Sequence, residues 1–234
     1  MERYRVATFD CYGTLVDWEG GLGSFLYAIA LREGDADCER GTALRSRWEE
    51  IQFRLIQEGP YRRYKEILVD ALREWAGERG YRWNERDGAA LADSMRSWQP
   101  FPDTRPALLQ AREAGLRLMI VSNTDRDIIE HTIKQIGVSF DEVQVAEDVK
   151  AYKPRREVFE RALERSGEAP ENVLHVAFGF KYDIGTAAGL GMGTAWVNRH
   201  LEPRPGDTAP DHEWRDLWGL ARLAGGEGPR TTAT

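Results

Sequence analysis

The stretch TFDCYGTLVDWEG, residues 8–20, is the point at which a short apolar run gives way to a loop. The run RVATF (5–9) has the continuous apolar character of a strand buried on both faces of a parallel sheet. Asp10 follows it directly, and Gly13 and Thr14 then break the regular pattern. Ligands of open parallel sheets bind outside the carboxyl ends of the strands. The sequence therefore places a carboxylate where such a fold carries its chemistry.

Similar apolar runs recur along the chain and alternate with helical patterns. Runs typical of buried strands are LRLMIVSN (116–123), VLHVAF (173–178) and GTAWVN (193–198). Between them, apolar residues at three- and four-residue spacing predict helices over 106–114, 125–136 and 156–166. This alternation predicts a doubly wound α/β fold with a Rossmann-like parallel sheet.

The region between residues 18 and 97 carries helical patterns alone. Its amphipathic segments predict helices over 22–32, 42–57, 61–77 and 84–98. We therefore expect a helical cap subdomain over 18–97, inserted into an α/β core domain made of 1–17 and 98–225. The Pro- and Asp-rich segment 201–214 predicts a surface loop, and residues 226–234 predict a disordered tail.

Charge and cysteine content narrow the class of protein. The net charge is −7, and 32 Lys and Arg residues are interspersed with 39 Asp and Glu, which argues against nucleic acid or a membrane as partner. Cys11 and Cys38 form no disulfide framework, and the N-terminus lacks the pattern of a signal peptide. We expect a cytoplasmic enzyme with a small-molecule substrate; a homodimer is compatible with the sequence.

Reactive side chains follow several of the expected strands. Asp10 follows the first, Ser122 and Asn123 follow the second, Lys153 lies on the loop VKAYKP, and Asp183 lies just beyond VLHVAF. Each has a structural alternative, because such residues also form turns, cap helices or lie solvated on the surface. Their joint order along successive strands favours a functional site.

That order resembles the haloacid dehalogenase superfamily over about residues 4–200. Its four signatures are matched here by Asp10 with Gly13-Thr14-Leu15, by Ser122-Asn123 in IVSNT, by Lys153 in YKP, and in part by Asp183 with GLGMGTAWVNR. The helical insert after the first signature also looks like the cap of this superfamily. The resemblance implies an Asp nucleophile at position 10.

Two positions separate the chain from the phosphatases of the superfamily. These carry an acidic Asp at the position of Tyr12 and a metal-binding Asp where the alignment places Phe178, which Ala177 precedes and Gly179 follows. Magnesium prefers a shell of hard oxygen ligands, and a phenyl ring supplies none. We therefore expect no metal ion, and the resemblance implies that no organic cofactor takes part either.

The sequence Asp-x-Tyr-Gly-Thr looks most like the type II, or L-2-haloacid, dehalogenases. The resemblance implies that Asp10 displaces halide from C2 of a short 2-haloacid and that water hydrolyses the resulting ester. In this assignment Lys153 keeps Asp10 ionised, because a nearby cation lowers a carboxyl pKa. Thr14 orients Asp10, and Asp183 activates the water. Asp183 could instead cap a helix.

The remaining site residues are expected to bind substrate. Tyr12 would supply an aromatic wall and a hydroxyl, or alternatively pack at the strand end. Ser122 would bind the substrate carboxylate, and Asn123 would lie near the departing halide. A cap arginine would take up the halide, and the candidates are Arg40, Arg45 and Arg47, of which we assign Arg45. Trp48 and Phe53 are more typical of core than of substrate wall.

Departures from the type II pattern keep two alternatives open. Ala177, Phe178 and Gly179 replace residues near the fourth signature that help to position water in this branch, and Phe159 stands where many members have Tyr. One alternative is a phosphatase of the same superfamily. The other is a catalytically altered homologue that acts on an unknown substrate.

Overall fold

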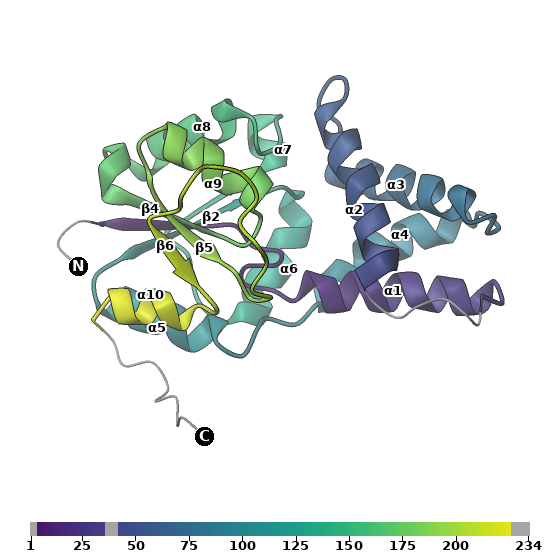
Figure 1. Ribbon diagram of the computed structural model, residues 1–234, viewed down its shortest axis with the longest axis horizontal. Helices are drawn as coiled ribbons and strands as arrows, with labels where there is room; N and C mark the ends of the chain where they lie inside the picture. The colour runs from purple at the N-terminus through teal and green to yellow at the C-terminus, as the bar shows by residue number, and fades with distance from the viewer. Residues whose placement is uncertain (1–3, 36–41, 226–234) are drawn as a thin grey trace.

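The structure, a computed structural model, describes residues 4–35 and 42–225 (Figure 1). The expected α/β fold is confirmed: six parallel strands form one sheet in the order β3-β2-β1-β4-β5-β6. The strands are β1 (Val6–Phe9), β2 (Arg117–Ser122), β3 (Glu142–Val145), β4 (Val173–Ala177), β5 (Gly193–Val197) and β6 (His212–Trp214).

Strand β1 lies in the middle of the sheet, between β2 and β4, and every residue in it is buried. Val6 pairs with Arg117 of β2 on one side and with Val173 of β4 on the other. The chain builds the sheet outward in one direction from β2 to β3 and in the other from β4 to β6. The carboxyl end of β1 is thus the switch point at which such sheets bind ligands, and Asp10 stands there.

Helices cover both faces of the sheet (Figure 1). On one face, α5 (Thr104–Glu113), α6 (Arg126–Ile136) and α10 (Trp218–Leu223) pack on Ala7, Phe9 and Ile120. On the other, α8 (Arg156–Ser166) and α9 (Phe180–Gly189) pack on Val6 and Met119, with the short α7 (Ala146–Val149) beside α8. The apolar strands therefore have a cover on each side, as a parallel sheet requires.

The helical region between β1 and α5 forms a separate bundle beside the sheet (Figure 1). It contains α1 (Trp18–Arg32), α2 (Thr42–Gln57), α3 (Tyr64–Glu78), α4 (Glu85–Ser94) and the 3₁₀ turn η1 (Met95–Ser97). Leu26, Trp48 and Trp75 are buried between these helices in a cluster that continues into the core. We call this bundle the cap. No described helix is both long and apolar enough to cross a membrane.

The predicted elements agree with the structure where the apolar pattern is strong. Helices α2 and α8 have the predicted bounds. Helix α1 begins four residues before the predicted residue 22, because Asp17 caps it by accepting a hydrogen bond from the Gly20 amide.

Strands β3 and β6 are not among the predicted strands, and the expectation of a loop throughout 201–214 is wrong over His212–Trp214. Both strands are short and carry polar residues, so they lack the apolar signal. The expected tail and Cys38 lie outside the described residues.

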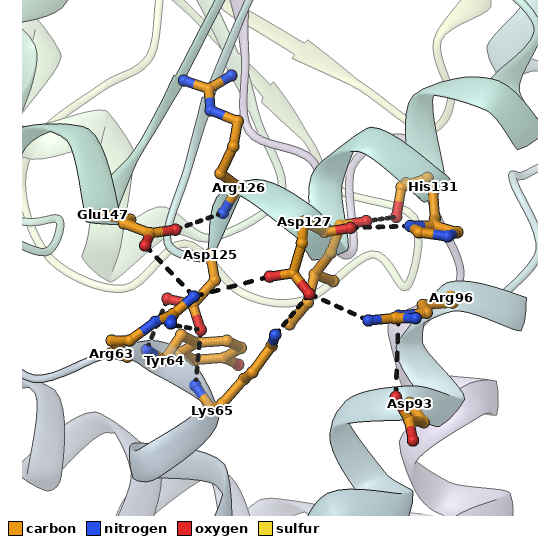
Figure 2. A network of polar contacts seen from close by, with 12 residues as sticks. Arg63, Tyr64, Lys65, Asp93, Arg96, Asp125, Arg126, Asp127, His131 and Glu147 are labelled. Atoms are coloured by element: carbon orange, nitrogen blue, oxygen red, sulfur yellow. Dashed lines mark hydrogen bonds and ion pairs between the residues drawn. The ribbon is translucent and has the colours of Figure 1, made fainter.

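The cap is attached to the core through the carboxylate of Asp125, shown in Figure 2. Asp125 is the N-cap residue of α6, but its side chain makes no capping hydrogen bond to that helix. Its two oxygens instead accept from the backbone amides of Tyr64 (2.9 Å) and Lys65 (3.0 Å), the first residues of cap helix α3. A carboxylate at a helix N-terminus satisfies free amides and favours the helix dipole. A core residue therefore caps a helix of the other subdomain.

Charged side chains surround this contact. Asp127 lies against Arg63, Lys65 and Arg96, all from the cap, and Arg63 also lies 3.3 Å from Glu147 of the core (Figure 2). The side chain of Asp127 is 38% exposed, whereas that of Asp125 is fully buried. Partly exposed ion pairs stabilise proteins little, so Asp125 should contribute more than the pairs around it.

We predict that Asp125→Ala lowers the free energy of unfolding by about 2 kcal/mol, because two partly buried amides lose a charged acceptor. The matched control is Asp127→Ala, for which we expect a loss within about 1 kcal/mol. Urea denaturation of the three proteins measures both values. Equal losses in the two variants would show that Asp125 contributes no more to stability than the ion pairs around it.

Candidate active site

The carboxylate of Asp10 is held by two side chains at the end of β1. The hydroxyl of Thr14 donates to Oδ2 over 2.7 Å, and Nζ of Lys153 donates to Oδ1 over 2.9 Å. Thr14 Oγ1 in turn accepts from the Phe178 amide over 2.8 Å, which ties the loop after β1 to the loop after β4. Both oxygens of Asp10 are thereby fixed in direction.

The turn that carries Thr14 depends on Gly13. Gly13 has φ of +96°, a conformation that side-chain-bearing residues rarely adopt. A Cβ there would lie 2.7 Å from the ring of Phe178 and 2.7 Å from Nε1 of Trp18. Gly13 thus permits the tight turn and lets the Phe178 ring approach the backbone beside Asp10.

A second carboxylate shares the same lysine. Nζ of Lys153 lies 2.8 Å from Oδ1 of Asp183, which also lies 2.9 Å from Nε2 of His175. The other ring nitrogen, Nδ1, lies 2.8 Å from the hydroxyl of Thr8 on β1. A continuous polar chain therefore runs through the sheet from Thr8 to Asp10.

The charged side chains of this hydrogen-bonded network are almost completely removed from water. Asp10 is 9% exposed, and Lys153 and Asp183 are each 1% exposed. Burial alone would lower the pKa of Lys153, but the two carboxylates outweigh it and raise the pKa above its usual value. Lys153 is therefore a permanent cation at neutral pH.

The two carboxyls respond differently to their surroundings. Burial raises the pKa of Asp10 above its usual value, and the Lys153 ammonium opposes this without cancelling it. Burial also acts to raise the pKa of Asp183, but Lys153 and the bond from His175 outweigh it, so that this pKa is lowered. The expected lowering by Lys153 is thus present at Asp10 but smaller than the effect of desolvation.

Asp10, Lys153 and Asp183 border a cavity of about 350 Å³ between the sheet and the cap. Several of its walls are aromatic, namely Tyr12, Trp18, Trp48, Tyr64, Trp98, Phe178, Phe180 and Tyr182. Asp183 and Gly179 both line it, and a Cβ added to Gly179 would be 3.1 Å from Oδ2 of Asp183, so this oxygen lies beside Gly179. An apolar enclosure of this kind strips water from a carboxylate. Both acids therefore face the space in which a small molecule would bind.

Ser122 and Asn123, at the end of β2, reach the same cavity with different partners. Ser122 is 3% exposed, and its hydroxyl has no hydrogen-bond partner within the described residues. The side-chain amide of Asn123 forms two hydrogen bonds with the backbone of Lys153. Asn123 Nδ2 donates to the Lys153 carbonyl over 3.1 Å, and Asn123 Oδ1 accepts from the Lys153 backbone N–H over 2.8 Å. Ser122 is thus available to a ligand, whereas Asn123 holds the loop that presents Lys153.

Tyr12 lies in the wall of the cavity with its hydroxyl engaged. The hydroxyl lies 2.9 Å from that of Thr132 on α6, and the ring meets Trp98 edge to face at 6.1 Å between centroids. Burial raises the pKa of the Tyr12 hydroxyl well above its usual value, so it remains protonated. The ring accordingly supplies the wall that the sequence suggested, while the hydroxyl bonds to the core.

Of the cap arginines considered, Arg45 lines the cavity. Its guanidinium lies 2.7 Å from the carboxylate of Glu19 and 5.6 Å from the ring centroid of Trp18. Arg47 is instead paired with Glu50 and Glu78 on the outer surface of the cap, and Arg40 lies outside the described residues. Arg45 therefore enters the site as part of an ion pair, which sequence inspection did not anticipate.

The residues at the site do not fit a magnesium ion. Across residues 4–35 and 42–225, no cluster of three or more His, Cys, Asp or Glu side chains is arranged to hold a metal. The position where metal-dependent relatives would carry an oxygen ligand is occupied by Phe178, whose ring packs on Gly13. Lys153 already places a cation between Asp10 and Asp183. A divalent ion would have to compete with this ammonium for the same oxygens.

Two residues of this hydrogen-bonded network, Thr8 and His175, are not among the predicted site residues. Both lie inside apolar strand segments, where a single polar residue gives little signal. They are register partners on β1 and β4, so their side chains emerge on the same face of the sheet. The sequence signal that could have found them is a buried strand carrying a histidine eight residues before Asp183.

Comparison with known proteins shows the family of the chain. The family of haloacid dehalogenase-like hydrolases matches residues 4–191, and the chain belongs to this family, as the resemblance implied. The chain is 27% identical over 224 residues to an (S)-2-haloacid dehalogenase of Pseudomonas fluorescens, covering 93% of this chain and 95% of the relative.

One solved structure and one further relative also resemble this chain. The crystal structure of an L-2-haloacid dehalogenase has a TM-score of 0.82 and 27% identity, covering 95% of this chain and 99% of the other. The chain is also 29% identical over 186 residues to a phosphoserine phosphatase of Thermus thermophilus, covering 73% of this chain and 75% of the relative.

We predict that Thr14→Val lowers the free energy of unfolding by about 1–3 kcal/mol, because the Asp10 carboxylate loses a donor and the Phe178 amide loses its acceptor. Thr14→Ser keeps the hydroxyl and should lie within about 1 kcal/mol of the parent. Urea unfolding compares the three proteins. A valine variant as stable as the serine variant would show that the hydroxyl does not hold the two loops together.

Proposed function

We propose that the protein hydrolyses L-2-haloacids to 2-hydroxy acids through an ester on Asp10, without a metal ion. The observation that carries the proposal is the Lys153 ammonium placed 2.9 Å from Asp10 and 2.8 Å from Asp183. This arrangement offers one carboxylate to attack carbon and a second to serve the following step, with a fixed cation between them.

In the first step, Oδ1 or Oδ2 of Asp10 attacks C2, forming a carbon–oxygen bond as the carbon–halogen bond breaks and halide leaves with the bonding electrons. Halide needs no proton to leave, so the absence of an acid at position 12 is no obstacle. The aromatic walls of the cavity desolvate the attacking carboxylate. Lys153 and Thr14 favour its ionised form, although burial raises its pKa, and their hydrogen bonds aim it.

In the second step, a water molecule attacks the carbonyl carbon of the Asp10 ester. Asp183, whose lowered pKa keeps it ionised, accepts a proton from this water. Collapse of the tetrahedral intermediate breaks the bond between the acyl carbon of Asp10 and the ester oxygen, and the alkoxide takes the proton held by Asp183 and leaves as a 2-hydroxy acid. Asp10, regenerated as the acid, then loses its remaining proton to solvent. Lys153 stabilises the oxyanion charge that develops on Asp10.

The substrate would be oriented by the remaining residues. Ser122 has a free hydroxyl for the substrate carboxylate. Arg45 is the candidate cation for the halide, and it would have to leave part of its contact with Glu19 to take this role. Asn123 acts through the Lys153 backbone rather than as a contact of the halide. Attack from the face opposite the leaving group implies inversion at C2.

A phosphatase of the same fold is the alternative, supported by the identity to a phosphoserine phosphatase. Tyr12 and Phe178 speak against it, because they replace the leaving-group acid and a metal ligand with aromatic rings. The two functions differ in substrate and in metal requirement, so a single assay series separates them.

We expect the purified protein to release halide from 2-chloropropionate or 2-bromopropionate, with the L isomer reacting and the product inverted, and with no loss of rate in excess EDTA. Halide is measured by ion chromatography and the product by chiral chromatography. Asp10→Asn serves as the inactive control. A strict requirement for Mg²⁺, or turnover of phosphomonoesters in place of haloacids, would favour the phosphatase.

A further inference from the structure

His175 is a buried polar residue that the proposed mechanism does not yet use. It is fully buried at the centre of β4, and its ring packs edge to face on Phe159 at 5.3 Å between centroids. Buried imidazoles require partners for both nitrogens, and both are present here. Nε2 lies 2.9 Å from Asp183 Oδ1, and Nδ1 lies 2.8 Å from Thr8 Oγ1.

The hydrogen-bond pattern assigns the tautomer. An ionised Asp183 can only accept, so the proton between the two residues must sit on Nε2. Nδ1 then carries a lone pair and accepts from the Thr8 hydroxyl. The other acceptor within reach of that hydroxyl, the Leu174 carbonyl, lies at 3.5 Å, which is a much weaker contact. By donating to Nδ1, the Thr8 hydroxyl therefore directs Nε2–H at Asp183.

The bond from His175 determines how Asp183 is oriented. Oδ1 accepts from both His175 and Lys153, so its lone pairs are committed to these two donors. Oδ2 is the oxygen left beside Gly179 at the edge of the cavity. A base that removes a proton from water must present a free lone pair within hydrogen-bond reach of it.

We propose that His175, held by Thr8, is a positioning residue for the second half-reaction: it donates Nε2–H to Asp183 and thereby aims Oδ2 at the water that hydrolyses the Asp10 ester. This inference rests on the proposed function. The role concerns the second half-reaction alone, because the hydrogen bonds that orient Asp10 come from Thr14 and Lys153. Loss of the His175 donor should slow hydrolysis of the ester while leaving its formation almost unchanged.

The test compares four variants in single-turnover reactions with an L-2-haloacid. His175→Phe keeps a ring against Phe159 but removes the donor, and His175→Gln returns an N–H near the position of Nε2. Val173→Ala is the control for loss of packing, because Val173 is a buried residue of the same strand that faces the same side. Asp183→Asn defines the behaviour expected when the base itself is removed.

Halide release reports formation of the ester, and intact-protein mass reports its accumulation. We expect His175→Phe to hydrolyse the ester at least about tenfold more slowly, the range of one hydrogen bond to a charged group, with halide release within about twofold of the parent. His175→Gln should recover to within about threefold, and Val173→Ala should match the parent.

A spectroscopic readout tests the tautomer without substrate. Imidazole ¹⁵N shifts of the four histidines, with the His175 signal identified by its loss in His175→Gln, should show a neutral Nε2–H form. Thr8→Val should disturb that signal.

The possible failures are distinct. A parent that releases no halide removes the proposed function and this inference with it. A parent that forms and hydrolyses the ester, beside a His175→Phe variant with normal hydrolysis or with both steps slowed equally, overturns this inference alone. An Nδ1–H tautomer would also overturn it.

Discussion

The site depends on one constraint: a single buried ammonium is shared by two buried carboxylates. Lys153 is 1% exposed and lies within 2.9 Å of both Asp10 and Asp183. Buried ions are stable only when they are paired and fully hydrogen-bonded. Each group next to these three charges therefore helps to satisfy or to fix one of them. Asn123 fixes the Lys153 backbone, Thr14 satisfies Asp10, and His175 satisfies Asp183.

The two carboxyls that share this ammonium differ in pKa. Both carboxylates lie at almost the same distance from the ammonium, so their difference arises from their other contacts. Asp183 gains a bond from His175 within the sheet and its pKa is lowered, whereas Asp10 faces the cavity and its pKa is raised by burial. Asp10 is the less stabilised anion, and a poorly solvated carboxylate is the better nucleophile toward carbon, which suits Asp10 to the attack that we propose for it. The second acid stays ionised and is suited to accept a proton from water.

The fold and the positions of Asp10, Lys153 and Asp183 could be predicted from sequence because strong local signals specify them. Buried strands read as apolar runs, and reactive residues at their carboxyl ends converge at the switch point of the sheet. The partners of these residues could not be predicted, since they come from distant segments. Thr8 and His175 meet through strand register across 167 residues, and Asp125 caps a helix 60 residues earlier in the chain. The pairing of Arg45 with Glu19 likewise depends on how α1 and α2 pack.

The central claim is that the carboxylate of Asp10 attacks the substrate carbon, and labelled water in a single turnover tests it most directly. With enzyme in excess over an L-2-haloacid in H₂¹⁸O, the ester route has water attack the Asp10 carbonyl. The heavy oxygen then remains on Asp10, and peptide mass spectrometry of the segment around TFDCYGTLVD should show it, while the first hydroxy acid formed is largely unlabelled. Labelled hydroxy acid with an unlabelled Asp10 would mean that water displaces the halide directly, and would contradict the assignment of Asp10 as nucleophile.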